Sequence, residues 1–260
     1  MAGIVNVSSK MVLRLAEMTW EEVRDLDKSH AVAILPAGAI EAHGPHLPLD
    51  TDLVIAEAMA ESGAAFLSSR GRLPVLLPSF AYTAALFAAA FPGTVSISTE
   101  AAETMVADIA QSLDRAGFHA LAIANSHLDP AHLAALHAAV ERIRRDTNMA
   151  VAFPDLTRKP WASRLTDEFK SGACHAGRFE TSIVMARDPD RVREMLRRQL
   201  PENPLSLSVA IREKKKTFAE AGGPLAYFGA PADASAEEGR RTIETLGEIL
   251  AESVLGEMPA

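Results

Sequence analysis

Five side chains that commonly bind metal ions occur within twelve residues near the start of the sequence. They are Glu41, His43, His46, Asp50 and Asp52. Carboxylate and imidazole groups are ligands that divalent ions such as zinc prefer. One glycine and two prolines lie between them and bend the backbone, so several side chains can converge with little further ordering. The alternative is a solvated polar turn, but so many groups directly after an apolar run favour a metal or catalytic site.

The elements around this cluster follow an α/β pattern. Ala31 to Leu35 is apolar and has the length of a buried strand, which we expect to break at Pro36 and Gly38. Residues 53–69 are rich in alanine and leucine at helical spacing. A strand, a polar loop and a helix in this order place the loop at the carboxyl end of the strand, where α/β proteins bind ligands.

A second buried strand is predicted at Ala120 to Ala124, and polar residues follow it as well. His127 and Asp129 come directly after this strand in the run NSHLD. The carboxyl ends of parallel strands lie at the same edge of a sheet. We therefore expect these two residues to meet the first cluster in one crevice.

A third candidate region lies at residues 172–182, in the run GACHAGRFETS. His175 lies between two glycines, and Glu180 begins a helix-like segment five residues later. The residues leave two interpretations of His175 open, a catalytic histidine or a buried, hydrogen-bonded one. Cys174 is a poor candidate nucleophile, because adjacent residues rarely align for proton transfer between thiol and imidazole.

The rest of the chain predicts further short strands and helices, with no internal repeat and no linker. Strands are expected at 73–78, 95–98 and 149–153, and helices at 19–26, 100–116, 131–145, 189–200 and 234–255. His132 and His137 on the 131–145 helix are expected at the surface and not at the site. We predict a single domain over residues 1–260.

Composition disfavours several classes of function. The chain has 260 residues, of which 48% are apolar, as in ordinary globular domains. A net charge of −8 and a pI of about 5.5 argue against a nucleic-acid partner, and the basic run Arg212 to Lys216 is expected to be a solvated surface. One cysteine permits no intrachain disulfide, which fits a cytoplasmic location. No apolar run reaches the roughly 18 residues of a membrane span, and the N-terminus lacks the apolar core of a signal peptide.

The candidate residues suit metal-assisted hydrolysis. They are Glu41, His43, Asp52, His127, Asp129 and Glu180. This set could hold one or two divalent ions (Zn²⁺, Mn²⁺ or Fe²⁺), with Asp52 as the expected bridge between ions about 3.5–4 Å apart. A metal-bound water would attack a carbonyl, and His175 would donate a proton to the leaving amine. The sequence contains no GxSxG, Walker or GxGxxG motif.

Five segments resemble motifs of the creatininase (creatinine amidohydrolase) family. They are ILPAGAIEAHGPHLPLDTD, FPGTVSIS, NSH, CHAGRFETS and YFGAPADASAEEG, and they span about residues 15–255. Family members are metal-dependent hydrolases of cyclic amides, formamides and related C–N bonds. The resemblance implies a single-domain, three-layer α/β/α sandwich with a mostly parallel central sheet. It also implies a small-molecule substrate and a homo-oligomer, commonly a hexamer.

The resemblance extends to individual site residues. It places metal ligands at Glu41, His43, Asp52, His127 and Asp129 and a proton-transferring histidine at His175. The chain departs from the family pattern in having Ser126 where a glycine is usual, and Asp129 where creatininase has glutamate. Glu180 is therefore expected either to act in catalysis or to replace Asp129 as a ligand. Creatininase uses two tryptophans near its substrate, whereas only Trp161 lies in a comparable region here, so we do not expect creatinine as the substrate.

We therefore expect a metal-dependent amidohydrolase acting on a small cyclic amide, formamide or related metabolite. The alternatives are a metal-dependent peptidase acting on a modified peptide, a non-catalytic metal-binding scaffold, and a lyase or isomerase. Loops at 81–93, 155–175 and 203–231 are expected to set specificity. Their large apolar residues would form either a pocket wall or a subunit interface; they are Phe87, Phe91, Trp161, Phe218 and Tyr227.

Overall fold

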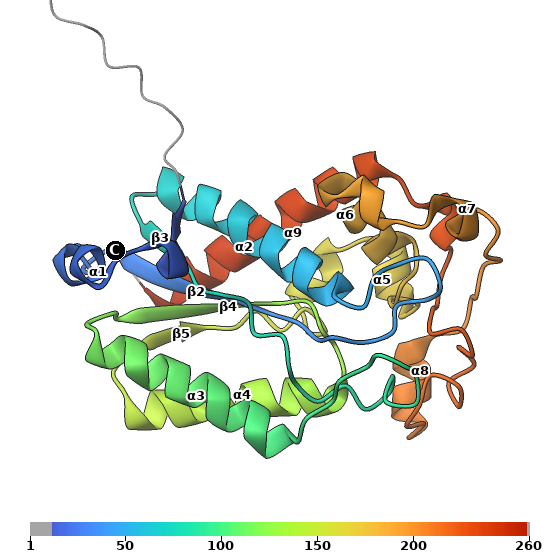
Figure 1. Cartoon of the computed structure of the whole chain (residues 1–260), viewed down its shortest axis with the longest axis horizontal. Helices are drawn as coiled ribbons and strands as arrows, with labels where there is room; N and C mark the ends of the chain where they lie inside the picture. Colours follow the sequence, from blue (N-terminus) through green and yellow to red (C-terminus); the bar gives the residue numbers. More distant parts are fainter. Residues whose placement is uncertain (1–11, 259–260) are drawn as a thin grey trace, which may run out of the picture.

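The computed structural model describes residues 12–258, and a five-stranded parallel sheet lies at their centre (Figure 1). The strand order is β1-β3-β2-β4-β5, and every neighbouring pair is parallel. The strands are β1 (Leu13–Arg14), β2 (Ala31–Ala37), β3 (Leu73–Leu76), β4 (Ala120–Asn125) and β5 (Ala150–Ala152). Helices cover both faces of this sheet, which confirms the predicted three-layer α/β/α architecture.

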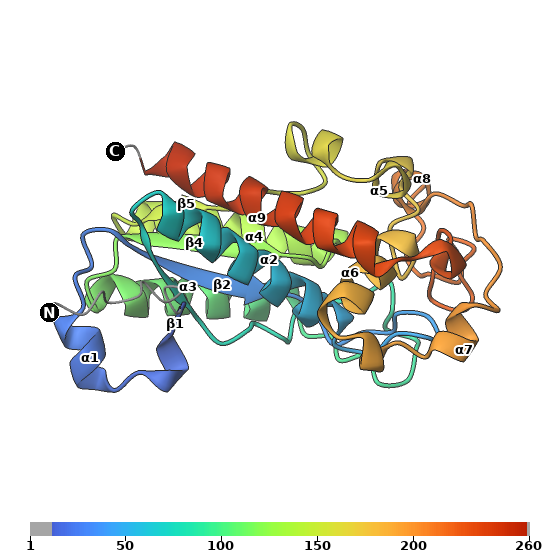
Figure 2. The ribbon, with the colours of Figure 1, turned by 90° about the horizontal axis from the view of Figure 1, so that it is seen from above.

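Alternate residues of the central strands pack against the helical layers on the two faces of the sheet. Helices α3 (Thr99–Arg115) and α4 (Pro130–Asp146) cover one face, and α2 (Thr51–Ser69) and α9 (Ala236–Glu257) cover the other (Figures 1 and 2). Helix α6 (Arg178–Arg187) packs against α2 and α9. In β2, Ala33 and Leu35 join the core with α3 and α4, while Val32 and Ile34 join the core with α2 and α9. Burial on both faces explains why this strand is continuously apolar.

Shorter elements connect these layers, and several of them gather beyond the carboxyl ends of the strands. The α-helices are α1 (Trp20–Asp25), α5 (Asp167–Ser171), α7 (Glu194–Arg197) and α8 (Leu207–Arg212). The 3-10 helices are η1 (Leu15–Glu17), η2 (Trp161–Arg164), η3 (Pro189–Arg191) and η4 (Pro231–Asp233). In both ribbon views α5, α7 and α8 lie at the end of the molecule toward which β2 runs (Figures 1 and 2). No helix among residues 12–258 is long and apolar enough to cross a membrane.

The expected break of the first strand at Pro36 was wrong, because β2 continues to Ala37. The carbonyl oxygen of Pro36 accepts a hydrogen bond from the Phe80 amide at 2.8 Å. The nitrogen of Pro36 points to the same side, where β3 has already ended at Leu76, so the missing N–H leaves no ladder bond unmade. The strand ends at Gly38 instead, where a Cβ would lie 2.7 Å from the Cβ of Asp52.

Two other expectations also differ from the structure. Residues 95–98 form only isolated bridges, one of them between Ile40 and Val95, and no continuous strand. The helix expected at 189–200 is divided into η3 and α7. The division occurs because the Arg193 amide donates to the carbonyl oxygen of His46 at 2.8 Å and not to the preceding turn. The predicted cap of α1 is confirmed, since Thr19 and Glu22 form a reciprocal capping box.

Candidate metal centre

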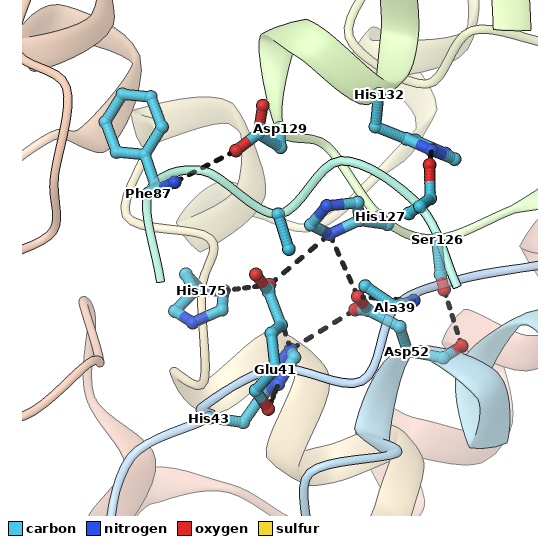
Figure 3. A network of polar contacts seen from close by, with 12 residues as sticks. Ala39, Glu41, His43, Asp52, Phe87, Ser126, His127, Asp129, His132 and His175 are labelled. Carbon is cyan, nitrogen blue, oxygen red and sulfur yellow. Dashed lines mark hydrogen bonds and ion pairs between the residues drawn. The ribbon is translucent and has the colours of Figure 1, made fainter. Parts of the chain in front are cut away.

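The loops that follow β2 and β4 bring predicted ligands from both strands together (Figure 3). Glu41 follows β2, Asp52 lies in the first turn of α2, and His127 follows β4. His127 Nδ1 lies 3.3 Å from Glu41 Oε1 and 3.0 Å from Asp52 Oδ2. The prediction that the two strand-end clusters share one crevice is confirmed, because β2 and β4 are adjacent and parallel.

Two residues of a third segment, His175 before α6 and Glu180 in its first turn, join this cluster together with His43. His43 Nε2 lies 3.2 Å from Asp52 Oδ1 and 3.7 Å from Glu180 Oε2. His175 Nδ1 lies 3.8 Å from Glu41 Oε1. Glu180 is in the first turn of α6, and its carboxylate accepts the Ala176 amide at 2.6 Å. All of the clustered carboxylates and imidazoles are buried.

Each of the three histidines uses one ring nitrogen to donate to a backbone carbonyl oxygen. His43 Nδ1 donates to Glu41 O at 3.1 Å, His127 Nε2 to Ala84 O at 3.0 Å, and His175 Nε2 to Ala42 O at 2.9 Å. A carbonyl oxygen only accepts, so the proton of a neutral ring lies on the nitrogen that faces it. In the neutral ring, the other nitrogen therefore presents its lone pair to the cluster, as in metal sites whose histidines are oriented by carbonyl groups.

The donor atoms form three overlapping groups, each compact enough for one metal ion. The groups are Glu41–Asp52–His127, His43–Asp52–Glu180 and Glu41–His43–His175. Asp52 belongs to two of them and directs one carboxylate oxygen to His127 and the other to His43. Glu41 Oε2 and His43 Nε2 are buried, and neither makes a hydrogen bond within the described part of the chain. Three buried carboxylates, with one unpartnered oxygen on Glu41, fit one or two divalent cations, which would offset the charge.

The electrostatics of the protein groups alone show how strongly these side chains interact. Burial opposes a charge on His43, but the attraction of Asp52, Glu180 and Glu41 outweighs it and raises the pKa of His43 to about 10. Burial also opposes a charge on His127, but the Glu41 and Asp52 carboxylates outweigh it and raise the pKa of His127 well above its ordinary value. Burial raises the pKa of Glu180 to about 8, with partial compensation by His43. The cluster therefore favours positive charge at its centre.

His175 differs from these two histidines. Burial, reinforced by nearby His43, lowers the pKa of His175 well below its ordinary value. Its ring also packs against Phe218, with the ring centroids 4.2 Å apart. The structure therefore holds His175 as a neutral, oriented imidazole at the edge of the cluster.

Asp52 is fixed by both neighbouring strand-end loops. The Ala39 amide donates to Asp52 Oδ2 at 3.2 Å, and the Ser126 hydroxyl donates to the backbone oxygen of Asp52 at 2.6 Å. The serine that departs from the usual family motif thus ties the loop after β4 to the first turn of α2. Gly38 permits the close approach of the chain to Asp52, because a side chain there would clash with it.

Asp129, which was predicted as a ligand, does not lie in the donor cluster. Its Oδ1 accepts the Ala131 amide at 2.8 Å and caps α4. Its Oδ2 accepts the Leu86 amide at 2.8 Å and the Phe87 amide at 3.1 Å. Figure 3 shows the contact with Phe87. Both oxygens are therefore occupied, Oδ1 in capping α4 and Oδ2 in holding the chain at residues 86–87. Glu180, the alternative ligand, lies in the cluster instead.

The expectation that His132 lies at the surface was wrong, since its side chain is fully buried. His132 Nδ1 lies 2.7 Å from the Thr83 hydroxyl and His132 Nε2 lies 2.8 Å from Asn125 Oδ1, so both ring nitrogens are used. Asn125 in turn bonds to the backbone N–H and C=O of His127. His132 thus holds Asn125, which in turn holds the backbone of His127. The helical spacing of the sequence alone did not indicate this role. The ring of His137, by contrast, is 38% exposed and pairs with Asp155.

Two members of the first sequence cluster also lie apart from the site. His46 Nε2 bonds to the Thr181 hydroxyl at 2.9 Å, and burial lowers the pKa of His46 to about 4. Asp50 forms an ion pair with Arg191 at 2.6 Å. Neither residue belongs to a donor group.

A cavity of about 480 Å³ opens above the donor cluster. Phe87 and Phe218 line it, as expected for a pocket wall, whereas Trp161 and Tyr227 do not. Phe91 packs against Phe218, with ring centroids 6.3 Å apart, and does not itself line the cavity. The lining also includes three exposed cations that the sequence did not assign to the site; they are Lys159, Lys170 and Arg212. Only Arg212 had a sequence signal, as the first residue of the basic run.

Cys174 lines the same cavity, but its environment argues against a nucleophile. Burial, with a contribution from the nearby Glu180 carboxylate, raises the pKa of its thiol to about 12. The thiolate is the reactive form of cysteine, so this side chain is held in its unreactive form at neutral pH.

Comparisons with known proteins agree on one family. The family model described as creatininase, creatinine amidohydrolase, matches residues 16–254. The mycofactocin precursor peptide peptidase of Mycolicibacterium smegmatis is 31% identical over 219 residues, covering 84% of this chain and 82% of that protein. The creatinine amidohydrolase of Pseudomonas putida is 26% identical over 194 residues, covering 68% and 73%.

Solved structures show the same fold. A crystal structure of creatinine amidohydrolase (creatininase) matches with a TM-score of 0.76 at 23% identity, covering 97% of this chain and all of that one. A creatininase structure named for manganese matches with a TM-score of 0.75 at 23% identity, covering 96% and 100%.

Proposed function

The chain belongs to the creatininase family, and from that premise we propose that it cleaves a C–N bond of a small amide, formamide or cyclic amide. One observation carries this proposal. Three carboxylates and three histidines, each with one ring nitrogen facing inward, converge at the floor of a cavity large enough for a small metabolite.

We propose two overlapping metal sites that share one carboxylate. Glu41 and His127 would hold one ion, His43 and Glu180 the other, and Asp52 would bridge them. The division of the Asp52 oxygens between His127 and His43 supports this assignment. The manganese-named creatininase structure supports Mn²⁺ or a similar divalent ion. When bound, such an ion supplies Lewis acidity, which acidifies a water molecule and polarises a substrate carbonyl.

His175 is the residue that we propose for proton transfer. Its Nε2–H is committed to the Ala42 carbonyl oxygen, so Nδ1 is the atom that would take up a proton and deliver it to the leaving nitrogen. The contact with Phe218 and the bond to Ala42 hold the ring in one orientation beside Glu41. A fixed ring next to the reacting centre is what general acid–base catalysis requires.

The cavity supports a substrate other than creatinine. The chain has only two tryptophans, and neither Trp20 nor Trp161 lines the cavity. The tryptophans that a creatinine-binding site was expected to use are therefore absent from its described walls. A second candidate function is cleavage of a modified peptide, which the 31% identity with the peptide peptidase favours.

Metal content and turnover together test the proposal. Protein purified without added metal, or incubated with Mn²⁺ or Zn²⁺, should carry close to two ions per subunit by elemental mass spectrometry. The loaded protein should hydrolyse at least one member of a panel of formamides, cyclic amides and N-acyl amino acids. Turnover of peptides alone would favour the second candidate. Absence of bound metal under every condition would contradict both.

The same preparation tests the expected homo-oligomer. Its mass in solution, measured by light scattering, should correspond to several subunits, with six as the number that the family resemblance implies.

A further inference from the structure

The two ends of the active-site cavity carry opposite charges. Its floor is formed by buried carboxylates and histidines of the donor cluster. Its mouth carries Lys159, Lys170 and Arg212, all of them exposed. These cations come from three separate segments, the loop before η2, the end of α5 and the end of α8. Their convergence is notable in a chain with a net charge of −8.

The charges at the mouth are largely available to a ligand. Lys159 and Arg212 form no ion pair with any residue in the described range 12–258. Lys170 pairs with Asp167 at 2.8 Å, but that carboxylate is 92% exposed and the pair is correspondingly weak. The cavity-lining carboxylates are Glu41, Asp52, Asp129 and Glu180, and all four are buried away from the mouth.

Apolar side chains also line the cavity. They are Phe87, Leu128, Leu207, Ile211 and Phe218. Phe87 and Phe218 pack on one another, and Phe218 also packs on His175. A ligand that fills the cavity therefore contacts hydrocarbon surface as well as the cations.

We propose that the substrate is an amide that also carries a carboxylate, separated from the scissile bond by an apolar spacer. Lys159, Lys170 and Arg212 bind that carboxylate and so determine specificity, which deepens and rests on the proposed function. The exposed residues that follow Arg212 are Glu213 and the lysines at 214–216, which together add two net positive charges to the field at this end of α8. Such a local field attracts anionic substrates to a protein whose overall charge would repel them.

Binding of matched probe pairs tests this specificity without requiring turnover. The acids are N-benzoylglycine, N-benzoyl-β-alanine and N-benzoyl-4-aminobutyrate, and each is paired with its primary carboxamide. Dissociation constants are measured by calorimetry on the metal-loaded protein. At least one acid should bind about tenfold more tightly than its carboxamide, because several exposed charge pairs of ordinary strength act together. The preference should fall as KCl is raised, since screening weakens it.

A triple variant, K159Q/K170Q/R212Q, should reduce the preference to less than about twofold. The matched control is R70Q/R115Q/R240Q, which removes the same charge from exposed positions that do not line the cavity and should keep the preference. Equal binding of acid and carboxamide at every spacer length would overturn the inference. A preference that persists in the triple variant would also overturn it, because the carboxylate would then be held at the floor.

The same compounds separate this inference from the proposed function. Preferential binding of acids without hydrolysis of any amide supports the cationic mouth and contradicts the amidohydrolase. Hydrolysis of an amide without a preference for acids supports the amidohydrolase and contradicts the cationic mouth. A small N-acyl amino acid and a peptide C-terminus present the same carboxylate, so peptides with free and amidated C-termini form a second arm. Preference in the peptide arm alone would identify a peptide as the source of the group.

Discussion

The floor and the mouth of the cavity are built in different ways. At the floor, adjacent parallel strands bring the ligand loops together, and hydrogen bonds to backbone groups orient the histidines. At the mouth, exposed cations come from short helices and loops and make few contacts. Under the proposed function, the sheet edge fixes the chemistry, whereas selection of the substrate is left to segments that can vary without disturbing it.

The largest effect is expected from Asp52→Asn at the floor. The amide would weaken both proposed metal sites at once, because Asp52 faces both His43 and His127. We expect loss of both ions and at least a hundredfold lower kcat/KM, since even changes outside the ligand shell cost about 10–100-fold. Elemental mass spectrometry and turnover measure this. Asp50→Asn is the matched control, because Asp50 pairs with Arg191 outside the cluster and its variant should keep both ions.

A comparison of Glu180 with Asp129 tests which carboxylates at the floor hold a metal ion. Glu180→Gln should lose one ion of two, because Glu180 faces His43 and Asp52. Asp129→Asn should keep both ions but lower the free energy of unfolding by about 1–2 kcal/mol, since an amide accepts at only one atom. Metal content and urea denaturation distinguish the two variants. Loss of an ion from the Asp129 variant alone would return the ligand assignment to the sequence-based prediction.

At the mouth, Arg212→Gln should leave the structure almost unchanged. Its side chain is exposed and forms no ion pair within the described chain, so the free energy of unfolding should change by less than about 0.5 kcal/mol. The metal content should equal that of the wild type. A lost ion or a large drop in stability would show that the mouth and floor are coupled, and would break the comparison drawn above.

The last prediction concerns an ion pair outside both regions, which provides a reference for them. Hydrogen bonds from Arg197, with a further contribution from Arg198, lower the pKa of Glu194 to about 2 from its ordinary value of 4.5. A lowered carboxyl pKa stabilises the fold above pH 4.5, and this contribution is lost as the pH falls toward 2. Glu194→Gln should therefore be less stable than wild type at pH 7, by less than about 1 kcal/mol because the Glu194 side chain is 39% exposed and solvent weakens the ion pair.

Urea denaturation at pH 7, 5 and 3 measures this difference. The gap between wild type and the Glu194 variant should be equal at pH 7 and pH 5 and smaller at pH 3. A gap that widens in acid would contradict the assigned direction of the pKa shift.

Much of the fold could be predicted because short stretches of sequence specify its strands and helix caps. The apolar runs that became β2 and β4 are short and end in polar residues, and the cap at Thr19 is visible in four consecutive residues. The meeting of Glu41 with His127 followed from a general property of parallel sheets. Pro36 misled the strand assignment because the cost of a proline depends on which neighbouring strand its nitrogen faces.

The sequence by itself thus determined the parallel sheet and most of the carboxylate and histidine side chains that cluster at its edge, since strand patterns and residue types are apparent in short stretches of sequence. Only the tertiary structure decided the direction in which each side chain points. Asp129 turns toward the amides of Leu86 and Phe87, more than forty residues away in the chain. Glu180 turns toward the cluster because α6 packs beside α2. Such choices depend on hydrogen bonds between distant segments, which no local pattern records.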